Sequence, residues 1–370
     1  MTLTPSRLLT RLDADIAAER DPLRADCLRA ERAAYLVRQG HTEEVKAELD
    51  ALHLRHDRRP NAEMSAWLSL VESLVSFFSD MGPLATDKMR RAHALSQAAG
   101  LTQLQARCAA WLAHMDYSRL DIGAMVLHVT QALQLASADL HDARSRASMV
   151  MAVGLHLAGQ MSLALPWYQR ARDHAVSIGD EVTTSALMHN MAWLRMHLLR
   201  QARATGEGDV IDRGHALLGL ESTVQYDQLI GVSSLASLKP ILRAQILALR
   251  GDAEQALALF EDHLSAQPDG MSRIQCTLLA EQAWCLVQVK EMDRALRAAK
   301  DAEASFAKET QIDDTAAAHS RLAEVFAALG EAETAERHQT LANDAWEKFS
   351  ELQERLGTAL GEITEFGTPK

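Results

Sequence analysis

The sequence is poor in cysteine and contains no long apolar run. Its four cysteines, among 370 residues, form no CxxC pair. Neither a disulfide framework nor a common zinc site is therefore predicted, and reduced, buried thiols are expected. No stretch reaches the roughly 18 consecutive apolar residues that a membrane-spanning helix needs. Charged residues also interrupt the N-terminal segment too early for a secretory signal. We therefore expect a cytoplasmic protein without a membrane partner.

Basic residues are outnumbered by acidic ones. The chain has 38 Lys and Arg against 50 Asp and Glu, which gives a formal net charge of −12. A nucleic-acid partner requires clustered basic side chains that neutralise phosphates. We therefore predict no nucleic-acid partner, and the acidic balance mainly favours solubility.

The common catalytic motifs are also missing. The sequence has no glycine-rich phosphate loop, no HExxH zinc motif and no GxSxG nucleophile motif. His53 and His56 are spaced as HxxH next to Asp57, but no third ligand can be named, so a solvated basic helix end is expected. The sequence therefore predicts no metal, no cofactor and no enzymatic activity.

What the sequence does contain is a repeated pattern of two short amphipathic helices. In the segment 237–268, apolar residues at helical spacing form one stripe before Gly251 and another after it. Gly251 can adopt the left-handed conformation that ends a helix, and Asp252 can cap the next helix. Pro268 then ends the unit. Because each stripe must be buried, the two helices are expected to form a hairpin.

The pattern recurs with a period near 40 residues. Small residues expected where the helices cross are 39 and 40 residues apart: Ala256, Ala295 and Ala335. The expected turn glycines are 42, 41 and 36 residues apart: Gly40, Gly82, Gly123 and Gly159. In the seventh unit Lys290 stands at the turn in place of glycine. The recurrence predicts an array of about eight hairpins.

The unit resembles the tetratricopeptide repeat. The matching positions are the small residue of the first helix, the turn, the crossing residue, the aromatic residue and the closing proline: Ala244, Gly251-Asp252, Ala256, Phe260 and Pro268. Pro240 stands where the usual first-helix tryptophan would be. The period exceeds the family's roughly 34 residues and is similar to the long-helix variant of bacterial signalling regulators. The resemblance implies an all-α, right-handed α-solenoid, with residues 1–205 and 206–341 as the two parts of one superhelix.

Beyond residue 341 the apolar spacing of a helix continues. The residues concerned are Trp346, Phe349, Leu352, Leu356, Leu360 and Ile363. The exposed end of a solenoid has to be covered, so we expect segment 342–366 to be a C-terminal capping helix. The alternative is a dimerising helix, which would make the chain a self-associating structural module and a homodimer.

The resemblance also implies where a partner binds. In this family the stacked first helices line a concave groove, and ligands lie in it. The residues expected to face that groove are His156, His189, Trp193, Met196, His197, Gln245, Trp284, Gln288, Ser320 and Glu324. Trp193 and Trp284 either fill the core between helices or serve as aromatic anchors for a peptide.

A small residue followed by an aromatic one recurs along the chain, as Ala34-Tyr35, Ala66-Trp67, Ala110-Trp111, Ala192-Trp193 and Ala283-Trp284. The Lys and Asn positions that clamp a terminal carboxylate in chaperone cochaperones are absent from the expected groove. We therefore predict a non-enzymatic scaffold or adaptor that binds a protein or an amphipathic or apolar peptide. The resemblance places it in bacterial signalling or regulation.

Overall fold

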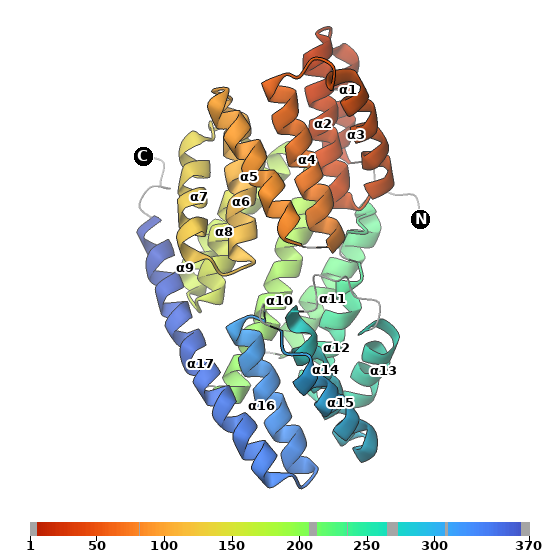
Figure 1. Ribbon diagram of the computed structural model, residues 1–370, viewed down its shortest axis with the longest axis vertical. Coiled ribbons are helices and arrows are strands. Elements are labelled where there is room, and N and C mark those ends of the chain that lie inside the picture. The colour runs from red at the N-terminus through yellow and green to blue at the C-terminus, as the bar shows by residue number, and fades with distance from the viewer. Residues whose placement is uncertain are drawn as a thin grey trace.

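The repeated amphipathic segments fold into helical hairpins (Figure 1). The computed structural model describes residues 6–80, 82–206, 213–234, 236–264, 273–307 and 310–363, and these ranges contain helices and no β-strand. Helix α1 (Arg7–Ala18) comes first. The first helices of the hairpins are α2 (Pro22–Gln39), α4 (Ala62–Asp80), α6 (Thr102–Tyr117), α8 (His141–Leu157), α10 (Glu181–Thr205), α12 (Leu238–Arg250), α14 (Gln275–Gln288) and α16 (Ile312–Ala328).

Each first helix packs against the helix that follows it. The second helices are α3 (Thr42–His56), α5 (Pro83–Ala98), α7 (Ile122–Leu135), α9 (Met161–Ile178), α11 (Arg213–Ile230), α13 (Ala253–His263), α15 (Met292–Ala304) and α17 (Ala332–Gly361). Within the described ranges the chain thus forms eight hairpins, and the predicted all-α solenoid is confirmed. The closing residue Pro268 and residues 364–366 of the expected C-terminal segment lie outside the described residues.

The turns follow the sequence signals with one exception. Gly251 ends α12 with φ +91°, and Lys290 adopts φ +64° where glycine is missing. In the third hairpin the left-handed residue is Leu120, with φ +55°, whereas Gly123 lies in the first turn of α7. The prediction that Gly123 forms the turn is wrong, because the Asp121 side chain accepts a hydrogen bond from the Ala124 N–H (3.1 Å) and starts the helix earlier.

Small residues allow the helices of each hairpin to approach closely. The crossing alanines predicted in the last three hairpins are buried: Ala256 and Ala295 completely and Ala335 almost completely. Phe260 of α13 is also completely buried and lies in the core of the C-terminal half. Burial of these apolar stripes stabilises the hairpins, because each stripe would otherwise face water.

The superhelix brings distant hairpins into contact. α1 to α9 form one end of the molecule and α11 to α16 the other, with α10 between them (Figure 1). The loop after α11 reaches the first hairpin, where the Ser233 N–H donates to the Gln39 carbonyl (2.8 Å). At a second crossing, Gln311 Nε2 donates to the Ser118 carbonyl (2.6 Å).

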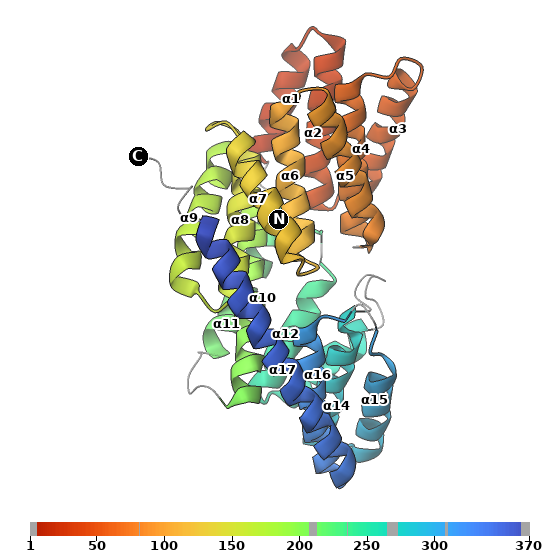
Figure 2. The ribbon, with the colours of Figure 1, turned by 60° about the vertical axis from the view of Figure 1, so that its left-hand side comes forward.

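Helix α17 also connects the two ends. It is a single helix of 30 residues whose first part pairs with α16, and its remaining part crosses α7 and α8 (Figure 2). Gly154 of α8 permits this approach, because a Cβ at that position would lie 2.5 Å from Leu360 Cδ1. Trp346, Phe349 and Leu356 are buried within their own chain, and Leu352 is half-buried there.

Candidate functional site

The first helices of the C-terminal half hold several of the predicted groove residues near one another. Trp193 stacks on His197, with ring centroids 4.6 Å apart and an interplanar angle of 27°. Arg200 Nη2 donates to His197 Nδ1 (2.9 Å), so His197 Nε2 carries the proton that it shares with Asp313. His197 is thus held between α10 and α16 by the protein's own polar groups.

Arg200 lies at the centre of this buried network. Its guanidinium nitrogens lie 3.4 Å from Glu281 Oε1 on α14 and 3.3 Å from Asp314 Oδ1 on α16. Burial would raise the pKa of Asp313, but His197 and Arg200 outweigh it and hold that pKa below its usual value. Burial and the neighbouring Asp313 raise the pKa of Asp314. The arrangement therefore ties three first helices together.

Helix α17 covers this part of the concave face. Trp346 Nε1 donates to Ser320 Oγ (2.9 Å), and Phe349 lies edge-on to His197 with ring centroids 6.5 Å apart. Gln353 Nε2 donates to the Leu157 carbonyl (2.7 Å) at the end of α8. A cavity of about 30 Å³ remains beside Ser320 and Glu324, which is room for water rather than for a peptide.

The other predicted groove residues are dispersed. His156 is 1% exposed and hydrogen-bonds through Nδ1 to the Tyr168 hydroxyl (3.0 Å) of its own hairpin. Met196 and Gln245 are buried, and Gln288 is exposed on α14.

Trp284 and His189 have different surroundings from the stacked pair. Trp284 is half-buried, with the Arg321 guanidinium 5.3 Å from its ring centroid. Burial, and to a smaller extent Lys239, lowers the pKa of His189 to about 4. The structure thus brings Trp193, His197, Ser320 and Glu324 around α17, whereas a partner contact for any of the ten residues stays a prediction.

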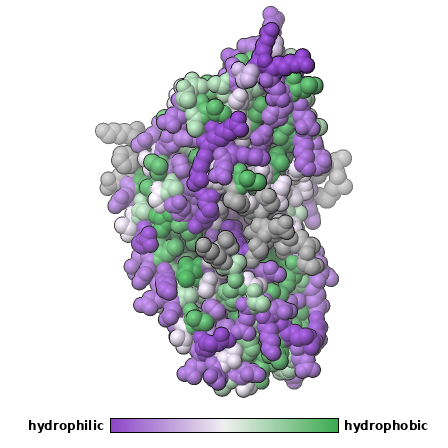
Figure 3. All heavy atoms as spheres, viewed as in Figure 1, coloured by the Kyte–Doolittle hydropathy of each residue, from purple (hydrophilic) through white to green (hydrophobic). Residues whose placement is uncertain are grey.

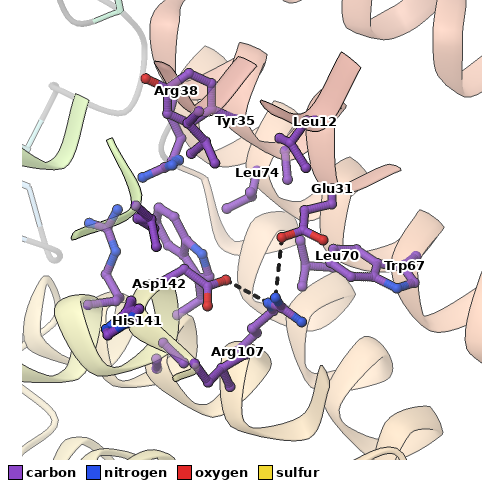
Figure 4. A pocket seen from close by; sticks show the side chains of 18 of the residues that line it. Leu12, Glu31, Tyr35, Arg38, Trp67, Leu70, Leu74, Arg107, His141 and Asp142 are labelled. Atoms are coloured by element: carbon purple, nitrogen blue, oxygen red, sulfur yellow. Dashed lines mark hydrogen bonds and ion pairs between the residues drawn. The ribbon is translucent and has the colours of Figure 1, made fainter. Parts of the chain in front are cut away.

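The N-terminal half contains a cavity that α17 does not line. It has a volume of about 130 Å³ and is lined by α1 and the first helices α2, α4, α6 and α8 (Figure 4). Leu12, Leu70 and Leu74 form its apolar wall. Arg11 and Asp139, which also line it, are exposed to solvent, so the cavity has a polar rim.

Three arginines and three aromatic rings line the cavity. Each guanidinium lies over a ring, and the distances from Cζ to ring centroid are 5.0 Å for Arg38 over Tyr35, 5.4 Å for Arg107 over Trp67 and 3.9 Å for Arg146 over Trp111. Such stacking is favourable, and it leaves the guanidinium edges available for hydrogen bonds.

Two of these arginines have acidic partners. Arg107 Nε lies 2.6 Å from Asp142 and its Nη2 lies 3.3 Å from Glu31, as the dashed lines in Figure 4 show. Arg38 lies 2.8 Å from Asp180 at the start of α10. Arg146 is different: burial, followed by the neighbouring Arg38, lowers its pKa to about 9.

This cavity is a candidate binding site that the predicted groove residues do not include. Its signal in the sequence is the recurrence of a small residue followed by an aromatic one, because Tyr35, Trp67 and Trp111 all line it. The arginines gave no such signal, since Arg38, Arg107 and Arg146 come from three different hairpins and only the superhelix brings them together.

Two other depressions of the described residues are larger and more open, with volumes of about 500 Å³ beside Arg24 and Gln103 and about 460 Å³ between α11, α12 and α13. On the face shown in Figure 3, hydrophilic residues predominate and apolar residues lie in small groups between them. Within the described residues, no cluster of three or more His, Cys, Asp or Glu side chains could hold a metal ion. His53 and His56 bind different carboxylates, Glu72 at 2.8 Å and Asp26 at 2.7 Å. Among the helices described, none is both long and apolar enough to cross a membrane.

The fold defines an all-α solenoid of helical hairpins, and comparison with known proteins agrees. No protein-family model matches the chain, and no curated protein matches it by sequence. Among solved structures, the chain is similar to a Rap protein complexed with Competence and Sporulation Factor. The TM-score is 0.55 at 10% sequence identity, and the match covers 90% of this chain and 99% of the Rap chain. At this identity the similarity shows the fold.

Proposed function

We propose that this chain is a non-enzymatic tetratricopeptide-like regulator that binds a peptide on the concave surface of its first helices, in the cytoplasm of a bacterium and in a signalling role. The observation that supports this most directly is the cavity of about 130 Å³ between α1, α2, α4, α6 and α8. Binding sites are concave, with an apolar lining and a few placed polar groups, and this cavity combines leucines, aromatic rings and arginines.

The similar solved structure supports the same class of function. That protein is a Rap protein in complex with Competence and Sporulation Factor. Helix α17 covers part of the first helices in the C-terminal half, whereas the cavity in the N-terminal half is not covered by it, which supports the cavity as the binding site.

Peptide capture tests the proposal. The purified protein is mixed with the fraction below about 3 kDa from a bacterial culture and extract. Bound material is separated by gel filtration and identified by mass spectrometry, and a synthetic copy is titrated by calorimetry. We expect a defined peptide with a Kd in the micromolar range or below, an affinity of about −8 kcal/mol or better.

A matched pair of variants locates the peptide. Ala34 is a half-buried residue that lines the cavity, so Ala34→Leu fills part of the space and should weaken binding by about tenfold or more. Ala327 is exposed on α16, and Ala327→Leu should bind as the natural protein does. Failure to retain any peptide would contradict the proposed function, and equal affinity of the two variants would contradict the location.

A further inference from the structure

Arg146 is a buried charge that forms no ion pair with any residue the structure describes. The residue is 7% exposed, yet within the described ranges no carboxylate oxygen lies within 4.0 Å of its guanidinium nitrogens. Its one hydrogen-bond contact there is weak, with Nη1 4.0 Å from Met149 Sδ. Burying an unpaired charge is costly, so the position of Arg146 in the cavity wall needs a reason.

The acidic groups near Arg146 are committed to other arginines. Asp142, one turn earlier on α8, is bound by Arg107 at 2.6 Å. Asp180 is bound by Arg38 through two nitrogens, at 2.9 and 2.8 Å. The Arg146 guanidinium lies over the Trp111 ring, with Cζ 3.9 Å from the ring centroid. Because stacking uses the face, the N–H edge of Arg146 remains available to a ligand in the cavity.

We propose that this cavity binds a carboxylate of a peptide, with Arg146 as its charge partner and Trp111 as the surface that holds the guanidinium flat; the inference rests on the proposed peptide-binding function. A planar guanidinium matches a carboxylate through two parallel hydrogen bonds. A doubly charged phosphate fits less well, because Asp142 and Glu31 line the same cavity and would repel its second charge.

The unpaired charge has a consequence for the ligand-free protein. Replacing Arg146 by an uncharged side chain removes a buried charge that has no ion-pair partner within 4.0 Å in the described residues, so the melting temperature should rise while ligand binding is lost. Sites that bind ligands often reduce stability in this way. A residue with a purely structural role would give the opposite sign, because its removal would lower the melting temperature.

Small probes test the carboxylate directly. N-acetyl-L-alanine, with its free carboxylate, should raise the melting temperature of the natural protein, and N-acetyl-L-alaninamide, its neutral counterpart, should not. Sodium chloride keeps the ionic strength equal in all samples, because salt screens the interaction. N-acetyl-L-aspartic acid α-amide separates a side-chain carboxylate from a terminal one. Tryptophan fluorescence gives the Kd, with Trp111→Phe identifying the contribution of Trp111.

Two variants complete the experiment. Arg146→Gln should melt at a higher temperature than the natural protein and weaken N-acetyl-L-alanine binding by at least about 30-fold. Arg170 lies over Trp167 at 4.5 Å but does not line the cavity, so Arg170→Gln is the matched control and should respond like the natural protein.

The results that would overturn the carboxylate assignment differ from those that would contradict the proposed function. An equal response to the neutral amide, an Arg146→Gln protein that still binds the carboxylate, or stronger stabilisation by inorganic phosphate would overturn the carboxylate assignment. The comparison of the two alanine probes uses the natural protein and holds even if a variant does not fold. Peptide capture that is indifferent to Arg146 would leave the proposed function standing without this inference.

Discussion

At the residue scale, the arginines of this chain differ in what lies beside their guanidinium groups. Arg200 is buried among Glu281, Asp314 and His197, and Arg203 on the same helix is exposed beside Glu324. Arg146 is buried with no carboxylate of the described residues within 4.0 Å. An arginine can thus stabilise a core, contribute little at a surface or, as proposed for Arg146, bind a ligand. Its neighbours determine which of these applies, because the cost of burying a charge depends on its partners.

Arg200 should be among the most sensitive positions for stability. Arg200→Met leaves Glu281 and Asp314 buried without their partner, so the free energy of unfolding should fall by about 3–5 kcal/mol. Arg203→Met, which breaks an exposed pair 3.4 Å long, should cost about 1 kcal/mol or less. Urea unfolding followed by circular dichroism measures both. Similar losses for the two variants would show that the network does not stabilise the core.

At the element scale, the single helix α17 has two structural roles. Its first part completes the eighth hairpin, and its second part places Phe349, Leu356 and Leu360 against the inner face of earlier hairpins. The helix therefore covers apolar surface of its own chain. Whether it also joins two chains stays a prediction.

Deleting residues 343–370 separates these alternatives. We expect the loss of α17 contacts to expose the apolar faces of α8 and α10, so the truncated protein should aggregate or lose more helicity than the deleted residues account for. Light scattering and circular dichroism measure this. The control deletes residues 364–370 alone, beyond the described part of α17. A dimeric natural protein that becomes a well-folded monomer on truncation would instead support the dimerising helix.

At the scale of the whole molecule, buried histidines couple stability to pH. Burial, followed by a neighbouring positive charge, lowers the pKa of His156, His189 and His319 to about 4, from an ordinary 6.5. Between these pH values the unfolded chain binds more protons than the folded protein. The free energy of unfolding therefore falls as the pH is lowered from about 6.5 towards 4, and each such proton steepens the slope by about 1.4 kcal/mol per pH unit.

Urea unfolding at a series of pH values measures this slope. His156→Asn, which removes one of the buried groups, should make the fall shallower. His41 is exposed, so His41→Asn should leave the slope unchanged. Stability that does not change over this interval, or that increases as the pH falls, would contradict the prediction.

The sequence by itself determined the helices, the hairpins and their period. Gly251 and the buried Ala256 and Ala295 act through contacts within one hairpin, and such local contacts leave a periodic signal in the chain. Lys290 was placed correctly at its turn for the same reason. Gly123 was misplaced because one capping aspartate was enough to shift the turn by a few residues.

Only the tertiary structure decided which part of the concave face is open. The course of α17 across α8 depends on Gly154, Leu360 and the curvature of eight stacked hairpins, to which no single repeat points. Arg38, Arg107 and Arg146 face one cavity because the superhelix superposes three hairpins. Charge pairing between hairpins has no fixed sequence spacing, so the buried Arg146, which forms no ion pair within the described residues, could be recognised only once the chain was folded.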